Sequence, residues 1–336
     1  MRKYILLLGI VAGCGDDGGS NDAGNGCDDP PGPFETGDPN GHATPLGAVE
    51  DEARAGRLVE GQLPPSTFGL LTWEVGDFVL ANDRIALVIE DVGDSDLYDP
   101  WGGRPVGLAR VSGGAMVGAA DFGEHFFMVG PSTILTTSVT VMNDGSDGGA
   151  AVIGATGPVR RMPFLDGIIG ALLFDGFEDM HAAIDYTLEP NAEHIDITMH
   201  VASPRGAPID SGFVIHGFMY TERMHAMVPG DGFDAQVGGA EWVQLVDDDA
   251  TSWAYSAGVP MNSGLAVSGF LGGTTDAYEI AACGVTDRSH ARIVIGGPGL
   301  DGLEQARARV EGRTLRAISG VVSDGVTAVS SATCRM

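Results

Sequence analysis

Basic residues are scarce in this chain. Lysine and arginine together supply 18 of its 336 residues against 46 aspartates and glutamates, so the formal net charge is −28. Lys3 is the sole lysine. A surface with this charge repels phosphate backbones and anionic lipid headgroups, which excludes DNA and RNA as partners. Carboxylates are the natural ligands of hard divalent cations, so Ca²⁺ stays open as a cofactor.

Hydrophobic runs long enough to cross a bilayer are also missing near the N-terminus. Tyr4–Val11 is apolar but too short to span, and it follows two basic residues, as in a secretory signal peptide. Val11-Ala12-Gly13-Cys14 matches the bacterial lipobox, in which the cysteine is acylated before the leader is cleaved. We therefore expect residues 1–13 to be a lipoprotein signal peptide and Cys14 to be the lipidation site.

The next segment has almost nothing to bury. Residues 14–45 are mostly glycine, aspartate, asparagine and proline, a composition typical of a flexible acidic tether. Acyl chains on Cys14 would then hold the protein to a membrane through its N-terminus. We expect it in the cell envelope, lipid-anchored to the outer membrane on its periplasmic or surface face.

Cysteine is rare. Besides Cys14, the chain contains only Cys27, Cys283 and Cys334, and their spacing has no metal-binding signature. In an oxidising compartment we expect one disulfide and one remaining thiol. Because Cys27 lies in the expected tether, the predicted pair is Cys283 with Cys334.

The clearest pattern that is present is an alternation of apolar and polar residues over Ala182–Pro204. Ile184, Tyr186 and Leu188 alternate with polar residues, and Pro190-Asn191 then turns the chain. The alternation resumes beyond the turn, where it places His194 and His200 on the polar face. A period of two predicts a hairpin of half-buried antiparallel strands, with these histidines solvated.

Many other short runs have strand character. Phe78–Leu80 and Ile85–Ile89 predict a second hairpin with its turn at Asn82-Asp83, and the latter strand is apolar on both faces. Further strands are expected at 107–111, 126–129, 134–142, 151–155, 159–162, 212–220, 241–245, 265–271, 278–282, 291–295 and from 318. Helices are expected only at Ala48–Glu60 and Gly302–Glu311, while Phe164–Phe174 fits a buried helix or a strand pair.

Short strands separated by turn signals predict an all-β fold, a large antiparallel β-sandwich with few short helices. No repeat of 20 to 50 residues is visible, which argues against a propeller or a solenoid.

Several motifs resemble one family. FVLANDRIALVIEDVG, DSDLYDPWGGRPVGLARV, SVTVMNDGSDGG and YTLEPNAEHIDITMHVASP, followed by VPGDGF and TSWAYS, are similar to the N-terminal half of lipoproteins from myxobacteria. In the longest of these, that half precedes a carboxypeptidase-regulatory-like β-domain and a PHP-type metallohydrolase domain. The resemblance implies a β-supersandwich of galactose-mutarotase type over residues 46–312.

The C-terminus carries the resemblance further. Leu315–Gly325 resembles the opening strand of the regulatory-like domain, so residues 313–336 are expected to be a stub of it. The metal centre of the hydrolase needs a His-x-His pair, and none of the eight histidines forms one. The hydrolase activity is therefore not inferred for this chain.

One loop holds a candidate metal site. It contains Asp91, Asp94, Asp96 and Asp99, whose carboxylates could converge on Ca²⁺, although the EF-hand spacing is absent. The alternative is a solvated loop whose aspartates cap turns.

Candidate catalytic groups come from the mutarotase resemblance, since such sandwiches use a histidine and a carboxylate to move a proton at a sugar ring. His216 interrupts an apolar strand and Glu241 opens the next one, so we expect the two to face each other. Glu222 and His225 lie between them in the sequence. The alternative for His216 is a histidine satisfied within the core. Trp101 and Trp242 are candidates for stacking on a sugar, with burial in the core as the alternative.

No Gly-x-Ser-x-Gly elbow and no dinucleotide-binding glycine pattern is present. Three functions remain. The first is a lipid-anchored protein with a non-catalytic binding or structural role, whose partner is a carbohydrate or an envelope protein. The second is a carbohydrate-active enzyme of mutarotase or lyase type. The third is a truncated remnant of a longer metallohydrolase lipoprotein.

Overall fold

The computed structural model describes residues 27–62, 73–93, 98–130, 132–163, 176–221, 223–233, 237–267 and 269–316. In these ranges the chain is mostly strand, and neighbouring strands pair antiparallel throughout, as in the central register of β10 on β11 and β9. The predicted all-β antiparallel class is confirmed. None of the described helices has the length and apolar composition needed to cross a membrane.

The smaller of the two main sheets has five strands in chain order. They are β1 (Ala53–Arg57), β2 (Phe78–Asn82), β3 (Ile85–Ile89), β4 (Pro105–Ser112) and β5 (Ala115–Val117). The short 3-10 helix η1 (Pro45–Gly47) precedes them.

The larger sheet has 14 strands in the order β15-β14-β16-β17-β21-β11-β10-β9-β7-β6-β13-β19-β18, with β8 paired to β9. Its strands are β6 (Glu124–Val129), β7 (Ser132–Ile134), β8 (Ser138–Asn143), β9 (Ala151–Arg161), β10 (His181–Leu188), β11 (His194–Ser203), β13 (Val214–Met219), β14 (His225–Val228), β15 (Gly232–Phe233), β16 (Trp242–Val246), β17 (Ser252–Ser256), β18 (Ser263–Val267), β19 (Phe270–Thr275) and β21 (Gly284–Gly296). A separate pair joins β12 (Ile209–Asp210) to β20 (Glu279–Ile280).

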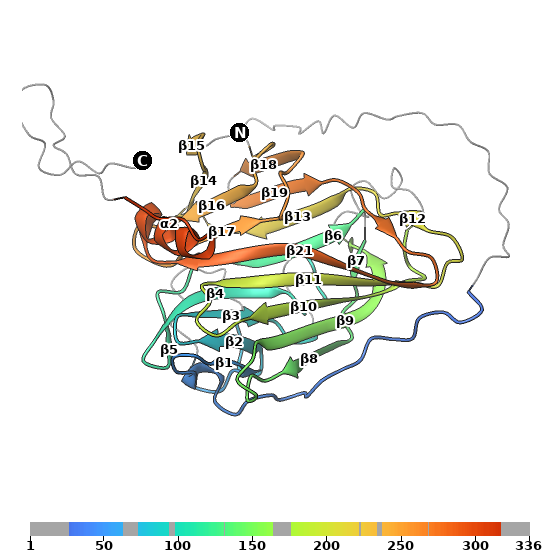
Figure 1. Ribbon diagram of the computed structural model, residues 1–336, viewed down its shortest axis with the longest axis horizontal. Coiled ribbons are helices and arrows are strands. Elements are labelled where there is room, and N and C mark those ends of the chain that lie inside the picture. Colours follow the sequence, from blue (N-terminus) through green and yellow to red (C-terminus); the bar gives the residue numbers. More distant parts are fainter. Residues whose placement is uncertain are drawn as a thin grey trace, which may run out of the picture.

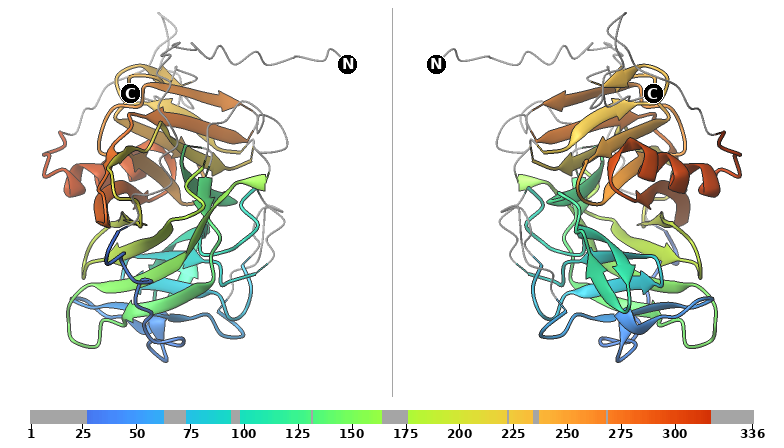
Figure 2. Two further views of the ribbon diagram at one scale, coloured as in Figure 1. Left: turned by 90° about the vertical axis from the view of Figure 1, so that its right-hand side faces the viewer. Right: turned by 90° about the vertical axis from the view of Figure 1, so that its left-hand side faces the viewer.

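The main core lies between these sheets. Inward side chains of β2, β3 and β4 pack with those of β9, β10 and β11 in one apolar cluster, which continues into β16, β17 and β21. Figure 1 shows the five-stranded sheet beside β8–β11 at one end of the molecule. Figure 2 shows α2 (Gly299–Val310) on the outside of the strands, where Leu300, Leu303 and Ala306 cover the end of β21.

The central hairpin has the predicted alternation. Ile184, Tyr186 and Leu188 on β10 are fully buried, and so are Ile195 and Ile197 on β11. Its turn is at Asn191, which has a φ of +61°, a conformation that asparagine tolerates. The side-chain amide of Asn82 donates a 2.8 Å hydrogen bond to the carbonyl oxygen of Ala192, so this turn docks onto the β2–β3 hairpin.

Both faces of β2 and β3 are buried, as the sequence predicts for the second strand. Leu80 and Leu87 belong to the main core. Val79 and Val88 point to the opposite face, where a second cluster with Trp73 covers them. The predicted hairpin is thus confirmed, with a second layer on its outer side.

The helix predicted at Ala48–Glu60 is wrong. Residues 53–57 form β1, which pairs with β2 over its full length. Ala53 and Ala55 are fully buried, while Arg54 between them and Arg57 at the end of the strand are half-buried. Burial of one face of the strand against β2 outweighs the weak helix preference of alanine. The second predicted helix is confirmed as α2.

Other boundaries differ where turns interrupt or bulges extend a strand. Residues 151–161 form one strand rather than two, and residues 134–142 divide between β7 and β8. Residues 265–271 span the turn of a hairpin, β18–β19. β17 was not among the predicted strands, and residues 164–174 lie outside the described residues.

An ion pair lies inside this core. Asp99 and Arg104 have fully buried side chains, and the guanidinium donates to the Asp99 carboxylate at 2.8 Å. Arg104 also donates to the hydroxyl of Thr133 and to the carbonyl oxygen of Ile134, both on β7. Tyr186 on β10 donates to the carbonyl oxygen of Gly103 at 2.9 Å. The pair therefore connects the loop before β4 to two strands of the large sheet.

We expect Arg104→Met to destabilise the protein by about 3–5 kcal/mol, because it leaves the Asp99 carboxylate buried without its counter-charge. Arg84→Met is the control, since Arg84 pairs with Asp83 at the surface with 40% of its side chain exposed; its effect should stay within about 0.5 kcal/mol. Urea denaturation measures both.

The double variant Asp99→Leu/Arg104→Met should be more stable than Arg104→Met alone, because it removes the unpaired charge. Equal losses for Arg104→Met and Arg84→Met would show that the buried pair does not have this structural importance.

Candidate functional site

The structure places the predicted catalytic residues that it describes in different environments. His216 on β13 is 1% exposed, and its two ring nitrogens face the hydroxyl of Tyr255 and that of Thr275. Burial lowers the pKa of His216 to about 3, so the ring is neutral. Glu241 is exposed just before β16, His225 is exposed on β14, and Glu222 lies outside the described residues.

His216 belongs instead to a cluster of buried rings. Its ring centroid lies 4.6 Å from that of His290, and Tyr255 contacts both His216 and His125. Burial holds the pKa values of His125 and His290 well below the usual range. The structure therefore supports the alternative for His216, a neutral histidine satisfied within the core.

Two aspartates of the predicted calcium-binding loop form ion pairs with two different arginines. Asp91 pairs with Arg57 at 2.6 Å, and Asp99 is the buried partner of Arg104. Asp94 and Asp96 lie outside the described residues. Among the described side chains, no group of three metal-ligating residues is arranged to hold a metal ion.

The two candidate tryptophans are in different environments. Trp242 packs beside the cluster under α2, and the guanidinium of Arg307 lies 5.8 Å from its ring centroid, so a packed helix covers it. Trp101 is half-buried in the loop after Asp99. The structure does not bring them together as one stacking platform.

The observed disulfide differs from the predicted pair. It joins Cys27 to Cys283, with a Cα–Cα distance of 5.4 Å, and Cys334 lies outside the described residues. The Cys283–Cys334 prediction failed because it treated Cys27 as part of a loose tether. Local sequence carries no information on a contact between residues 256 positions apart.

Residues 27–37, which we call the strap, cross the outer face of the central strands. At one end the strap is held by the disulfide and by a hydrogen bond from the Cys27 amide to the Pro204 carbonyl oxygen. At the other end the Gly37 amide donates to the Thr140 hydroxyl at 2.9 Å. Asp38 then exchanges two 2.8 Å backbone hydrogen bonds with Val141 of β8. Residues 27–45 are thus not the flexible tether that was predicted.

Three prolines stiffen the strap between its two attachments. Pro30, Pro31 and Pro33 favour the extended polyproline conformation, which advances about 3.1 Å per residue. Ten residues then reach about 30 Å. Four strand spacings of about 4.8 Å, about 19 Å in all, separate β21 from β8, so the strap is long enough to cross them.

A groove of about 250 Å³ lies between the strap and the sheet. Phe34 and Glu35 of the strap form one side. The remaining lining residues come from four neighbouring strands: Thr140, Met142, Gly154, Ala155, Thr156, Ala183, Asp185 and His200. An apolar surface with a few convergent polar groups is the usual composition of a small-molecule site.

His200 is the polar centre of the groove. On β11 it lies directly opposite Asp287 of β21 and diagonally from Asp185 of β10. Its Nδ1 is 2.7 Å from a carboxylate oxygen of Asp287, and its Nε2 is 3.3 Å from Asp185. Hydrogen bonding to Asp185 and then to Asp287 outweighs burial and raises the pKa of His200 to about 8, so the imidazolium form dominates at neutral pH.

Gly154 forms the floor of the groove beside His200, Asp185 and Asp287, which we call the His200 triad. A Cβ atom there would lie 2.9 Å from Met142 and 3.0 Å from Oδ1 of Asp185. The absence of a side chain at this position therefore leaves room beneath Asp185. The Phe34 ring centroid lies 6.2 Å from that of His200, so an aromatic face and a charged group share the groove.

The sequence contained half of this site. Its alternation placed His200 and Asp185 on the polar face of the hairpin, and the diagonal cross-strand relation follows from pairing the two strands. The pattern gave no indication of the strap, because Phe34 and Glu35 reach the groove through contacts that are distant in sequence, the Cys27–Cys283 disulfide and the hydrogen bonds to β8. Asp287 was missed because β21 begins well before the predicted strand at 291–295.

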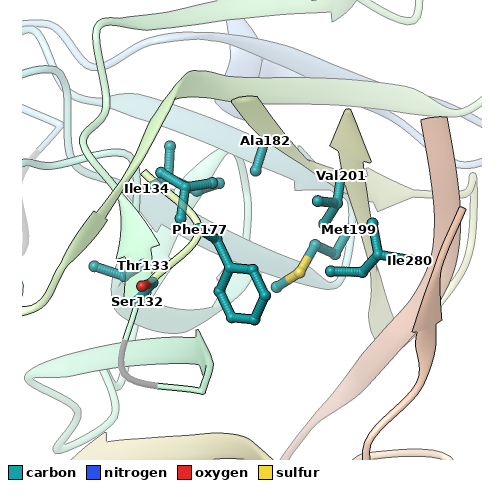
Figure 3. Close-up of a pocket in the computed structure, with 9 residues that line it drawn as sticks. Ser132, Thr133, Ile134, Phe177, Ala182, Met199, Val201 and Ile280 are labelled. Carbon is teal, nitrogen blue, oxygen red and sulfur yellow. The ribbon is translucent and has the colours of Figure 1, made fainter. Parts of the chain in front are cut away.

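Two other hollows are less suitable for a ligand. Figure 3 shows one of about 20 Å³ inside the core, where Phe177, Met199 and Ile280 converge; it has room for about one water molecule. A shallow groove of about 790 Å³ beside α2 is lined by several arginines. Arg307 pairs there with Glu304 and Glu311, and Arg309 pairs with Glu193, so most of this positive charge is compensated.

No protein-family model and no curated protein sequence matches the chain. Solved structures are distantly similar in fold. A galactose mutarotase related enzyme from Lactobacillus acidophilus is 7% identical with a TM-score of 0.40, covering 67% of this chain and 98% of its own. A GH36 alpha-galactosidase from Geobacillus stearothermophilus is 9% identical with a TM-score of 0.35, covering 68% of this chain and 42% of its own.

A protein in the glycosyl hydrolase family 38 from Enterococcus faecalis is 11% identical with a TM-score of 0.39, covering 69% of this chain and 32% of its own. This chain thus spans less than half of either glycosidase. The likeness is one of β-sandwich layout alone. The roles of individual residues are therefore derived from the contacts in this chain.

The charge on His200 makes stability depend on pH. Its pKa is raised on folding, so its contribution is complete below the unfolded value near 6.5 and is lost as pH rises through about 8. We expect the free energy of unfolding of the wild type to fall by at most about 2 kcal/mol between pH 6 and pH 9 relative to His200→Gln. The loss will be smaller where solvent screens the pair, since the Asp287 side chain is 70% exposed.

Urea denaturation at the two pH values measures this difference. His225→Gln, which removes an exposed histidine on β14, is the control and should follow the wild type. An identical pH dependence in the wild type and His200→Gln would contradict the assigned ion pairs.

Proposed function

We propose that this protein is a lipid-anchored, extracytoplasmic binding protein that takes a carbohydrate in the groove beneath the strap. The observation that carries the proposal is the groove itself. It combines a half-buried aromatic ring, Phe34, with hydroxyl, carboxylate and imidazolium groups from adjacent strands. Sugars offer an apolar ring face and many hydroxyls, and this lining can match both.

The way the site is built favours binding over catalysis. The strap is fixed at both ends and stiffened by proline, so its aromatic ring is held in place before a ligand arrives. Such preorganisation lowers the entropy lost on binding. His200 is held between two carboxylates, which keeps it in its charged form rather than free to accept a proton.

The extracytoplasmic part of the proposal is supported by two features. A disulfide such as Cys27–Cys283 persists in oxidising compartments and is rare in the cytosol. The lipobox at Val11–Cys14 would attach the body to a membrane through acyl chains, and residues 15–26 would separate the anchor from the disulfide. An envelope protein is a further partner class compatible with this location.

An enzyme of mutarotase type is the second candidate. The observation in its favour is the groove-facing His200 with Asp185 3.3 Å away, which is an acid–base pair in reach of a bound sugar. Exchange of aldose anomers by the purified protein, abolished by His200→Gln, would favour it over pure binding. The remnant hypothesis is decided by whether hydrolase coding follows residue 336 in the genomic sequence.

We expect Phe34→Ala to weaken sugar binding at least fivefold, which corresponds to about 1 kcal/mol, because it removes the aromatic face of the groove. A glycan array screened with the full-length protein in detergent identifies the ligand, and calorimetry measures the affinity. Phe213→Ala, which truncates an exposed phenylalanine before β13, is the matched control and should bind as the wild type does. Equal affinities of Phe34→Ala and the wild type would remove the groove as the binding site.

We expect Cys14→Ala to abolish membrane attachment, because no other cysteine follows a lipobox. The variant should move from the detergent phase to the aqueous phase on phase separation and should no longer incorporate labelled palmitate. Cys334→Ala is the control and should stay membrane-bound. A Cys14→Ala protein that remained in the detergent phase would refute the lipid anchor.

A further inference from the structure

Charge in the groove points to a particular class of sugar. Two carboxylates line it, those of Glu35 and Asp185, and a third, that of Asp287, contacts its histidine. No arginine or lysine is among the described lining residues. His200 is thus the single basic group that the described lining contributes.

The positive charge of His200 already interacts with two carboxylates of the protein. Its Nδ1 faces Asp287 at 2.7 Å and its Nε2 faces one oxygen of Asp185 at 3.3 Å. One imidazolium compensates at most one of the three carboxylates. The groove without a ligand therefore has a net negative charge.

The second oxygen of Asp185 is placed to receive a donor. Oδ1 lies 3.0 Å from the position that a Cβ atom would take on Gly154, and both Gly154 and Asp185 line the groove. Glu35 is exposed on the strap at the same groove. A ligand between the strap and the sheet thus meets carboxylates from both sides.

We infer that the ligand is an amino sugar with a free ammonium group, such as a de-N-acetylated hexosamine unit; this deepens the proposed carbohydrate binding and rests on it. An ammonium group is a three-way donor, and carboxylates accept from it in charge-assisted hydrogen bonds about twice as strong as neutral ones. N-acetylation removes that charge and adds bulk, and a uronic acid is repelled by the same carboxylates.

The remaining surface of the groove fits the ring of such a sugar. Phe34 and Met142 offer apolar contacts, and the hydroxyls of Thr140 and Thr156 are in reach of ring hydroxyls. The volume of about 250 Å³ is slightly below the ~300–1,000 Å³ of drug-sized pockets, which suits a mono- or disaccharide unit. The net charge of −28 attracts cationic ligands from a distance, an effect that salt screens.

The test compares two disaccharides with the same rings: the dimer of glucosamine and its N,N′-diacetyl form. Titration calorimetry with the full-length protein in detergent measures both at low and at high salt. We expect the free amine to bind at least tenfold more tightly at low salt, and this preference to shrink at high salt.

Three variants locate the effect. Asp185→Asn and Glu35→Gln should each reduce the preference for the free amine at least threefold. Asp231→Asn removes one negative charge, as the other two variants do, but from the exposed β14–β15 turn, so it should keep the preference. Glu35 is exposed on the strap, so Glu35→Gln remains informative if Asp185→Asn folds poorly.

Each outcome decides between hypotheses. Equal binding of both dimers, lost in Phe34→Ala, would overturn the amino-sugar inference and leave carbohydrate binding intact. Absence of binding by either dimer and by every sugar on the array would overturn both. Competition by spermidine, an ammonium ligand without a sugar ring, would also overturn the inference, since it would show that charge alone is recognised.

Discussion

The buried ion pair between Asp99 and Arg104 is the constraint on which the arrangement of the sheets depends. Both side chains are fully buried in an otherwise apolar core, where an ion pair is tolerated only if its polar atoms are extensively hydrogen-bonded. Arg104 meets this condition through Asp99 and through Thr133 and Ile134 of β7. Glu124 of β6 accepts hydrogen bonds from the amides of Tyr98 and Asp99 and, because of its burial, has a pKa raised to about 8.

This polar cluster also sets the register of the central hairpin. The Tyr186 hydroxyl is bonded to the carbonyl oxygen of Gly103, next to the ion pair, so Tyr186 must point inward. A shift of β10 by one residue would turn its side chains to the other face. With Tyr186 inside, Asp185 must lie on the outer face, beside His200 and under the strap. The core contact thus determines the chemistry of the groove on the opposite side of the sheet.

Two groups of histidines in the large sheet differ in charge because they differ in burial. His125, His216 and His290 face inward among aromatic rings and are neutral, because the core disfavours their charged form. His200 faces outward between two carboxylates and is charged. Both kinds lie on strands of the same sheet, and the face to which each side chain points makes them different.

The sequence alone determined the features that depend on neighbouring residues. Four features could be predicted because each follows from residues close together in the chain: the period of two over β10 and β11, the two apolar faces of β3, the helix α2 and the acidic surface.

Tertiary structure alone decided three other features. β1 replaced a predicted helix because pairing with β2 outweighs local preference. His216 points into the core, where it contacts Tyr255 and Thr275. Cys27 bonded to Cys283, 256 residues away, and so drew a proline-rich segment over the hairpin to make the groove. Contacts between residues so far apart depend on the packing of the whole fold. Patterns of neighbouring residues therefore do not predict them.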